Sequence, residues 1–120
     1  MAEPNPEELL NLGIKNYEKQ DFSKARKYFE KACDLNNGRG CNGLGFLYEN
    51  GRGVEKNSKK AAYLYSRACE LKDGGGCGAL GGLYYNGDGV KQDSKKAAAL
   101  FEKTCKLGNQ LACEMLKLLR

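Results

Sequence analysis

The spacing of the six cysteines is the feature that most constrains how this chain can fold. They form three Cys-x7-Cys pairs that recur every 36 residues: Cys33 and Cys41, Cys69 and Cys77, Cys105 and Cys113. Two loops repeat almost verbatim at the same period, Gly51-Arg52-Gly53-Val54 and Gly87-Asp88-Gly89-Val90. Self-similarity at a fixed period of about 20–50 residues is typical of a repeat array, whose neighbouring units bury a shared core.

Each repeat contains two stretches with the apolar periodicity of an amphipathic helix. In the first unit, one apolar stripe is formed by Phe22, Ala25, Phe29, Ala32 and Cys33. We expect the first helix of each unit over residues 6–19, 39–50 and 75–86, and a last helix over 110–119. The helices over 39–50 and 75–86 should each end at a glycine that can adopt the left-handed conformation. The second helices should begin near Ser58 and Ser94, whose hydroxyls could act as N-caps. The sequence therefore predicts an all-α fold over residues 1–120, an α-solenoid of stacked antiparallel helix hairpins with about seven helices.

The cysteines of each pair can bond only if the chain reverses between them. Within one helix, residues eight apart are separated by about 12 Å along the axis, which is too far for a disulfide. Turn-forming residues do lie between them: Asn36-Asn37-Gly38, Lys72-Asp73-Gly74 and Gly108-Asn109. We therefore predict the disulfides Cys33–Cys41, Cys69–Cys77 and Cys105–Cys113, each worth about 2–3 kcal/mol on the chain-entropy model.

Two other roles for the cysteines are disfavoured. A zinc site needs four ligands, the chain has no histidine, and the x7 spacing is not that of a zinc knuckle. Buried free thiols would not need such regular pairing. Disulfides imply an oxidising compartment, so we expect a secreted or periplasmic protein, no metal and no cofactor. The first residues carry no signal peptide, so we expect a form from which that segment has been removed.

The residues of the repeat resemble known helical-repeat families. The first unit, with Leu9, Leu12-Gly13, Phe22, Ala25, Phe29 and Ala32, resembles a tetratricopeptide repeat. The later units resemble the Sel1-like variant through Leu44-Gly45-x-x-Tyr48, Gly51-x-Gly53-Val54 and Lys60-Ala61-Ala62. With one disulfide per repeat, the whole chain resembles the Helicobacter cysteine-rich protein family. The expected units are a tetratricopeptide-like hairpin (6–37), two Sel1-like repeats (38–73 and 74–109) and a C-terminal capping helix (110–120). The low repeat number and extra glycines also fit a truncated or engineered consensus form.

This resemblance implies secretion, a right-handed superhelix and protein–protein interaction through a concave groove lined by the first helix of each unit. Mapping the family's groove positions onto this chain gives Leu10, Ile14, Tyr17 and Glu18, then Arg39, Asn42, Phe46, Glu49 and Asn50, then Gly78, Gly82, Tyr85 and Asn86. Asparagine amides can both donate to and accept from a peptide backbone. Structural readings stay open for several of them: Asn50 and Asn86 could instead cap helices, and Phe46 could belong to the core. Gly78 and Gly82 could leave room in the groove or mark tolerant sites, whereas Gly81 indicates close helix approach.

Members of this family have also been described as penicillin-binding proteins or weak β-lactamases. This is the alternative function, but the sequence lacks the motifs of the serine enzymes. No Ser-x-x-Lys, Ser-Asp-Asn or Lys-Thr-Gly element is present, and there is no histidine to act as general base. We therefore expect a binding protein and not an enzyme. An engineered scaffold without a natural ligand is a third possibility.

The formal net charge of +5 does not indicate a nucleic-acid partner. The basic residues are scattered over the expected helices and are not interleaved with base-stacking aromatics. No apolar run approaches the roughly 20 residues needed to span a bilayer. We expect a monomer whose partner is a protein or peptide.

Overall fold

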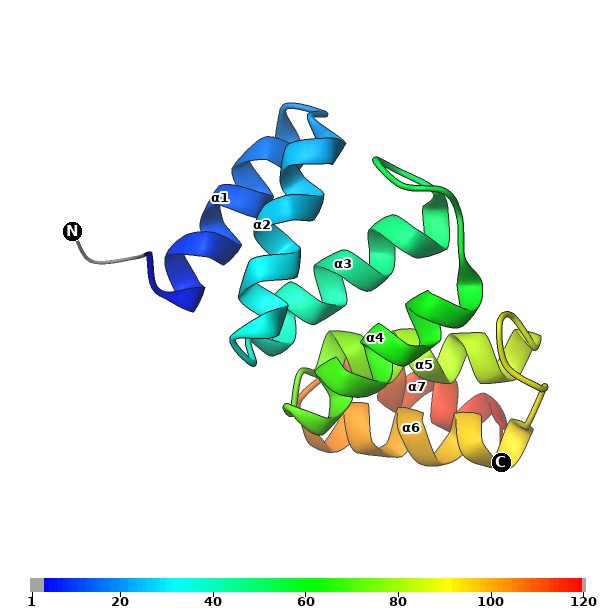
Figure 1. Ribbon diagram of the computed structural model, residues 1–120. Coiled ribbons are helices and arrows are strands. Elements are labelled where there is room, and N and C mark those ends of the chain that lie inside the picture. The colour runs from blue at the N-terminus through cyan, green and yellow to red at the C-terminus, as the bar shows by residue number, and fades with distance from the viewer. Residues whose placement is uncertain (1–3, 120) are drawn as a thin grey trace.

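The computed structural model describes residues 4–119, over which the chain forms seven α-helices (Figure 1). These are α1 (Pro6–Glu18), α2 (Phe22–Asp34), α3 (Gly38–Asn50), α4 (Ser58–Glu70), α5 (Gly74–Asn86), α6 (Ser94–Lys106) and α7 (Gln110–Leu119). Each helix packs against the next along the chain, so the hairpins α1–α2, α3–α4 and α5–α6 follow one another through the molecule, and α7 packs on α6. The array measures 52 × 28 × 22 Å. The all-α solenoid fold predicted from the sequence is confirmed.

An asparagine or aspartate begins each helix by accepting a hydrogen bond from a first-turn amide. These residues are Asn5, Asp21, Asn37, Asn57, Asp73, Asp93 and Asn109. The prediction that Ser58 and Ser94 are the N-caps of α4 and α6 is wrong, because each is the first residue inside its helix. The residue before each serine caps instead, and its short polar side chain satisfies the otherwise unpaired amides.

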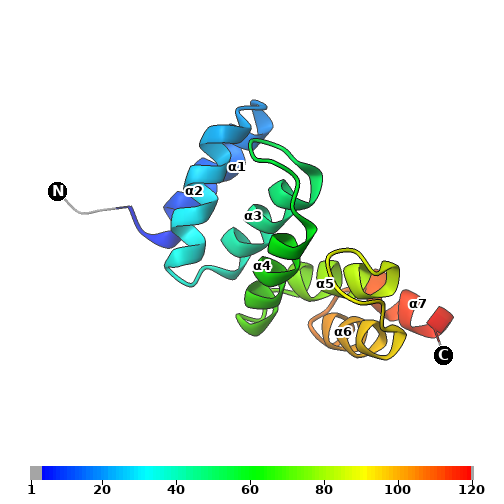
Figure 2. The ribbon, with the colours of Figure 1, turned by 45° about the vertical axis from the view of Figure 1, so that its right-hand side comes forward.

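The repeated glycine loops are explained by two geometric needs. Helices α3 and α5 end at Gly51 and Gly87, whose φ angles of 64° and 74° are left-handed, as predicted. Further along each loop, a Cβ at Gly53 would lie 2.6 Å from the backbone carbonyl of Phe22, and one at Gly89 would similarly overlap the backbone of Ser58. Each loop therefore lies directly on the start of the second helix of the preceding unit, as Figure 2 shows for the α3–α4 loop and α2.

The core runs continuously from one hairpin to the next. One buried cluster joins the first two hairpins and includes Leu10, Phe29, Leu44, Leu47 and Leu64. A second cluster, around Tyr65, Leu80 and Leu83, joins the second and third hairpins. A smaller one joins α6 to α7 through Ala97, Phe101 and Leu116. No single hairpin encloses its own core, which is the arrangement expected of a solenoid.

Close approach within each hairpin depends on a glycine opposite an aromatic ring. The pairs are Gly13 with Phe29, Gly45 with Tyr65, and Gly81 with Phe101. A Cβ added at Gly45 would lie 2.8 Å from the Tyr65 ring, and one at Gly81 would lie 3.0 Å from the Phe101 ring. The predicted reason for Gly81 is thereby confirmed.

Candidate functional site

Three disulfides each join the last helix of a hairpin to the helix that follows, as predicted. Cys33–Cys41 joins the end of α2 to the start of α3, Cys69–Cys77 joins α4 to α5, and Cys105–Cys113 joins α6 to α7. The Cα atoms of the pairs are 4.5, 4.5 and 4.8 Å apart. The chain thus reverses inside each pair, and the covalent links hold α3 and α5, which carry the candidate groove residues of the second and third units, whereas those of the first unit lie on α1.

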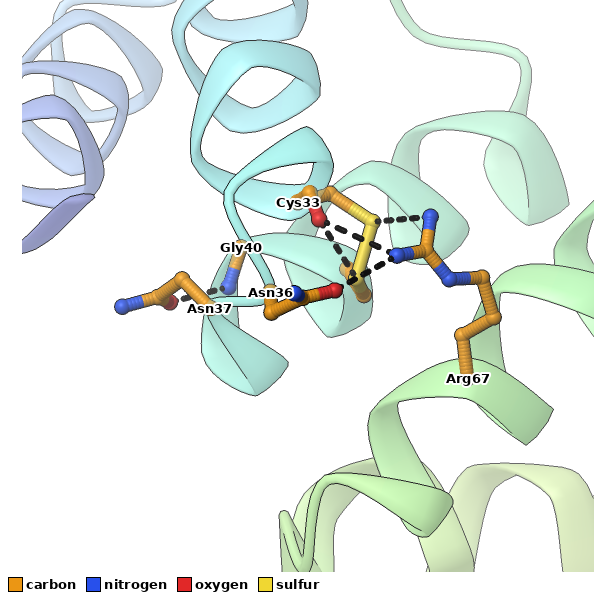
Figure 3. The surroundings of a disulfide bond; sticks show 6 residues. Cys33, Asn36, Asn37, Gly40 and Arg67 are labelled. Carbon is orange, nitrogen blue, oxygen red and sulfur yellow. Dashed lines mark hydrogen bonds between the residues drawn. A yellow bond between two sulfur atoms is a disulfide. The ribbon is translucent and has the colours of Figure 1, made fainter.

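Arg67 adds a non-covalent link at the first disulfide (Figure 3). From α4, its Nη2 atom donates hydrogen bonds to the Cys33 carbonyl oxygen at 3.3 Å and to Asn36 Oδ1 at 3.2 Å. Its Nη1 atom also lies 3.5 Å from Cys33 Sγ. Sequence reasoning missed this contact, although one signal was available: the corresponding positions of the other units are the lysines Lys31 and Lys103.

A hollow of about 290 Å³ lies between α1 and α3. It is lined by Ile14, Tyr17, Phe29, Asn42, Gly43 and Phe46. Four of these, Ile14, Tyr17, Asn42 and Phe46, are among the groove residues proposed from the sequence. The Tyr17 and Phe46 rings meet edge to face with centroids 6.1 Å apart, and Phe46 is 42% exposed. Phe46 is therefore not a core residue, and the hollow combines an apolar floor with one amide.

Arg52 from the α3–α4 loop contacts the tyrosine of this hollow. Its Nη1 atom donates a hydrogen bond to Tyr17 Oη at 2.9 Å, and its guanidinium carbon lies 5.3 Å from the centroid of the Phe22 ring. The corresponding residue of the second loop is Asp88, so this contact is specific to the first loop. This exposed hydrogen bond favours one orientation of the Tyr17 hydroxyl at the hollow.

Asn42 reaches from the hollow toward the third unit. A Cβ at Gly75, in the first turn of α5, would lie 2.7 Å from the Asn42 amide nitrogen. The glycine at position 75, which corresponds to Arg39 one repeat earlier, therefore leaves room for the Asn42 side chain.

Other predicted groove residues lie elsewhere. The prediction for Leu10 is wrong, since it is 2% exposed and packs in the first core cluster. Asn50 and Asn86 are exposed and are not helix caps, because Gly51 and Gly87 fill that role. The Asn50 amide donates instead to the Phe46 carbonyl oxygen at 2.9 Å.

Two of the four predicted groove positions in the third unit are glycines, which present no side chain to the surface. A Cβ at Gly78 would be in ordinary contact with the Thr104 methyl group at 3.5 Å, and one at Gly82 would have no neighbour within 4 Å. Tyr85 is 42% exposed. These residues and the exposed Arg39 do not line the hollow, which is formed by the first two hairpins.

Glu49, another proposed groove residue, is engaged within the fold. Its Oε1 atom accepts a hydrogen bond of 2.6 Å from the hydroxyl of Tyr65, a side chain that is 1% exposed. Burial, followed by the hydrogen bond and charge of Glu49, raises the pKa of the Tyr65 hydroxyl far above its ordinary value. Glu49 thus positions the middle hairpin.

Neither a metal centre nor a membrane span is found within residues 4–119. There, no three side chains of histidine, cysteine, aspartate or glutamate are grouped so that they could hold a metal ion. None of the helices in the same range has the length and apolar character to cross a bilayer.

Comparison with known families matches almost the whole chain. The Sel1 repeat family matches residues 38–73 and 76–109, and the tetratricopeptide repeat family matches residues 6–39. These ranges correspond to the three hairpins and their connecting turns.

Curated relatives come from Helicobacter pylori. A 60-residue segment is 62% identical to HcpC, and it makes up 50% of this chain and 21% of that protein. A 61-residue segment is 56% identical to a protein named beta-lactamase HcpA, of which it makes up 24%. The matched segments thus span only about a quarter or less of these relatives.

Solved structures extend the likeness to the full array. Cysteine-rich protein B of Helicobacter pylori superposes with a TM-score of 0.76 and 38% identity, over 92% of this chain and 94% of that one. A protective antigen of uropathogenic Escherichia coli with an SLR fold superposes with a TM-score of 0.86 and 31% identity, over 93% of this chain and 25% of that one.

Proposed function

Because the chain belongs to the Sel1-repeat proteins and is related to the cysteine-rich proteins of Helicobacter, we propose that it is a protein-interaction module. Its ligand is an extended peptide segment or loop that inserts an apolar side chain into the hollow between α1 and α3. The observation that carries this proposal is the aromatic floor of that hollow, formed by the partly buried Tyr17 and the exposed Phe46 beside the Asn42 amide. Exposed aromatic side chains beside a hydrogen-bonding group are typical of interaction hot spots.

The size of the hollow favours a peptide anchor. Pockets that enclose a whole small ligand have volumes of about 300–1,000 Å³. At about 290 Å³ and open to the surface, this hollow suits one or two apolar side chains, while Asn42 pairs with the peptide backbone. Its rigidity comes from the Cys33–Cys41 link at the base of α3 and from Arg52 on Tyr17. Little ordering free energy is then lost on binding.

A peptide-display selection against the oxidised protein tests this function. Peptides that bind are measured against Phe46→Ala, which removes the floor of the hollow, and we expect binding at least about tenfold weaker. Tyr63→Ala is the matched control, because Tyr63 is an aromatic residue of α4 that is 62% exposed and lies outside the hollow. Equal loss in both variants, or no loss in Phe46→Ala, would refute the assignment of the binding site.

The three disulfides favour an oxidising compartment, so we propose that the module acts outside the cytoplasm, in the periplasm or as a secreted protein. Mass spectrometry of the protein alkylated directly in its native host, without reduction, should show all six cysteines paired. Free thiols in that sample would argue against such a location.

A β-lactamase activity is the second candidate, favoured by the names of the Helicobacter pylori relatives, HcpC and HcpA included. The matches cover only 21% of HcpC and 24% of HcpA, and this chain lacks the Ser-x-x-Lys element of the serine enzymes. A nitrocefin assay separates the two candidates. We expect hydrolysis at the rate of buffer alone, and measurable turnover that copurifies with the protein would favour the enzyme.

A further inference from the structure

A second cavity, of about 520 Å³, lies between α2 and the α3–α4 loop. It is lined by Arg26, Tyr48, Gly53, Val54, Glu55, Lys56, Asn57 and Lys60, and it shares no residue with the hollow between α1 and α3. Three cationic side chains therefore face this cavity against one carboxylate. We propose that the cavity binds an oxyanion, the carboxylate or phosphate group of a small ligand.

Arg26 carries much of this argument because its hydrogen-bonding capacity is largely unused. Within residues 4–119, its Nε atom is buried and has no acceptor. Its Nη1 atom makes one long contact of 3.4 Å with Glu30, an exposed pair of little energetic weight. An arginine side chain presents two parallel donors that match a carboxylate or phosphate, and a bound oxyanion would pair with the terminal nitrogens of Arg26, whose one contact within the described residues is the long one to Glu30.

Lys60 and the start of α4 add to the positive potential. The Lys60 ammonium is held 4.6 Å from the centroid of the Tyr48 ring, at the wall of the cavity. Asn57, the N-cap of α4, also lines it, so the positive end of that helix points toward the same space. Because this N-cap is a neutral amide, the capping side chain itself does not offset the helix dipole.

The next repeat provides an internal comparison. Its corresponding cavity, of about 400 Å³, is lined by Tyr84, Val90, Lys91, Gln92, Asp93 and Lys96. The lysine over a tyrosine is kept, with Lys96 Nζ 5.3 Å from the Tyr84 centroid. The N-cap there is Asp93, a carboxylate.

Two cationic positions are lost and one is gained in that second cavity. The residues that correspond to Arg26 and Lys56 are Ala62 and Gln92. Glu55 changes in the opposite sense, to Lys91, but Lys91 presents no planar fork of donors. The two cavities therefore have the same backbone elements and the same lysine–tyrosine contact, but they differ in the cationic and capping side chains that would bind an oxyanion.

This pairing defines the test, an NMR titration of the oxidised protein at constant ionic strength. Inorganic phosphate and sodium acetate are titrated separately, so that the phosphate and carboxylate sources are distinguished. We expect saturable shifts of the amides over residues 54–60 with at least one of the two anions, and binding at least about tenfold weaker at residues 90–96.

The variants exchange residues between the two cavities, so each introduces a side chain that the same frame already carries. Arg26→Ala and Asn57→Asp should each weaken the binding about tenfold, while circular dichroism shows unchanged helicity. Asn57→Asp is the sharper variant, because aspartate caps α6 at the corresponding position. Equal shifts at both loops, no saturable shift with either anion, or unaltered binding in both variants would overturn the proposal.

Discussion

Replacing Gly82 with alanine should stabilise the protein, because Gly82 lies in the middle of α5, where glycine is unfavourable. This helix also contains Gly78 and Gly81 and is a poor helix by intrinsic propensity. An added Cβ at Gly82 would have no atom within 4 Å, so the alanine meets no steric cost. The change from glycine to alanine inside a helix is worth about 1 kcal/mol. We expect the free energy of unfolding to rise by that amount and the melting temperature by about 4 °C.

Gly45→Ala is the matched change with the opposite sign. It gains the same propensity, but its Cβ would lie 2.8 and 2.9 Å from two ring carbons of Tyr65 and 3.4 Å from the Ala61 carbonyl oxygen. Tyr65 is buried and hydrogen-bonded to Glu49, so its ring cannot move aside cheaply. Overpacking of a core costs about 1–3 kcal/mol, which exceeds the gain. We expect a net loss of about 1 kcal/mol.

Urea unfolding of the oxidised proteins, followed by far-ultraviolet circular dichroism, measures both changes. Gly78→Ala serves as a second positive control, because its Cβ would make only an ordinary contact of 3.5 Å with Thr104. The three variants are compared at equal denaturant slope, so that a change in midpoint reports stability. A neutral or destabilising Gly82→Ala, or a Gly45→Ala as stable as the parent, would refute the reasoning from added Cβ contacts.

Three further predictions concern positions where the repeats differ. Lys72 has a left-handed φ of 64°, which is costly for lysine, so Lys72→Gly should raise the free energy of unfolding by about 0.5–1 kcal/mol in the same urea assay. The raised pKa of Tyr65 means that the folded chain keeps a proton that the unfolded chain loses above about pH 10. The free energy of unfolding should therefore be undiminished below that pH and fall above it by up to about 1.4 kcal/mol per pH unit. Urea titrations at about pH 9 and about pH 11 should show this fall in the parent protein and not in Tyr65→Phe. Arg67→Lys loses the forked contact with the first disulfide turn, so native-state hydrogen exchange should show opening of the first hairpin made easier by about 1 kcal/mol, with no change in α5 and α6.

The repeat frame was accessible from the sequence because its signals reinforce one another. The cysteine period fixed where the chain reverses, and glycines at the helix ends marked where α3 and α5 stop. The N-caps of α4 and α6 were misplaced by one residue, although Asn57 and Asp93 stand directly before the two serines. Both residue types cap well, and only the backbone conformation decides which of two neighbours lies outside the helix.

The candidate site was less accessible, because it depends on which way each side chain turns. Leu10 stands three residues before Gly13, and Asn42 stands three residues before the corresponding Gly45, so the two occupy the same position of their hairpins. Leu10 nevertheless packs inward, because a leucine side chain gains about 2 kcal/mol by burial. The contacts of Arg52 and Arg67 join residues that are 35 and 31–34 positions apart, and periodicity carries no information on such pairs. Their only trace in the sequence is that each arginine differs from the residue at the same position of the other units. Arg52 corresponds to an aspartate, and Arg67 corresponds to lysines.

Positions at which the repeats carry different side chains can be interpreted because the contacts that hold the helices together are the same in each repeat. The glycine–aromatic pair and the capping residues recur in all three hairpins, and a disulfide follows each of them, so the same kinds of contact hold the helices of each unit. A change of side chain at such a position therefore alters the surface without moving the helix that carries it. Ile14, Phe46 and Gly82 occupy one such position, and the apolar floor is present in the first two units and missing from the third. The two cavities at the loops differ in the same way, because Arg26 of the first unit corresponds to Ala62 of the second. In a solenoid held this rigidly, the positions at which the repeats disagree are those free to specify a ligand.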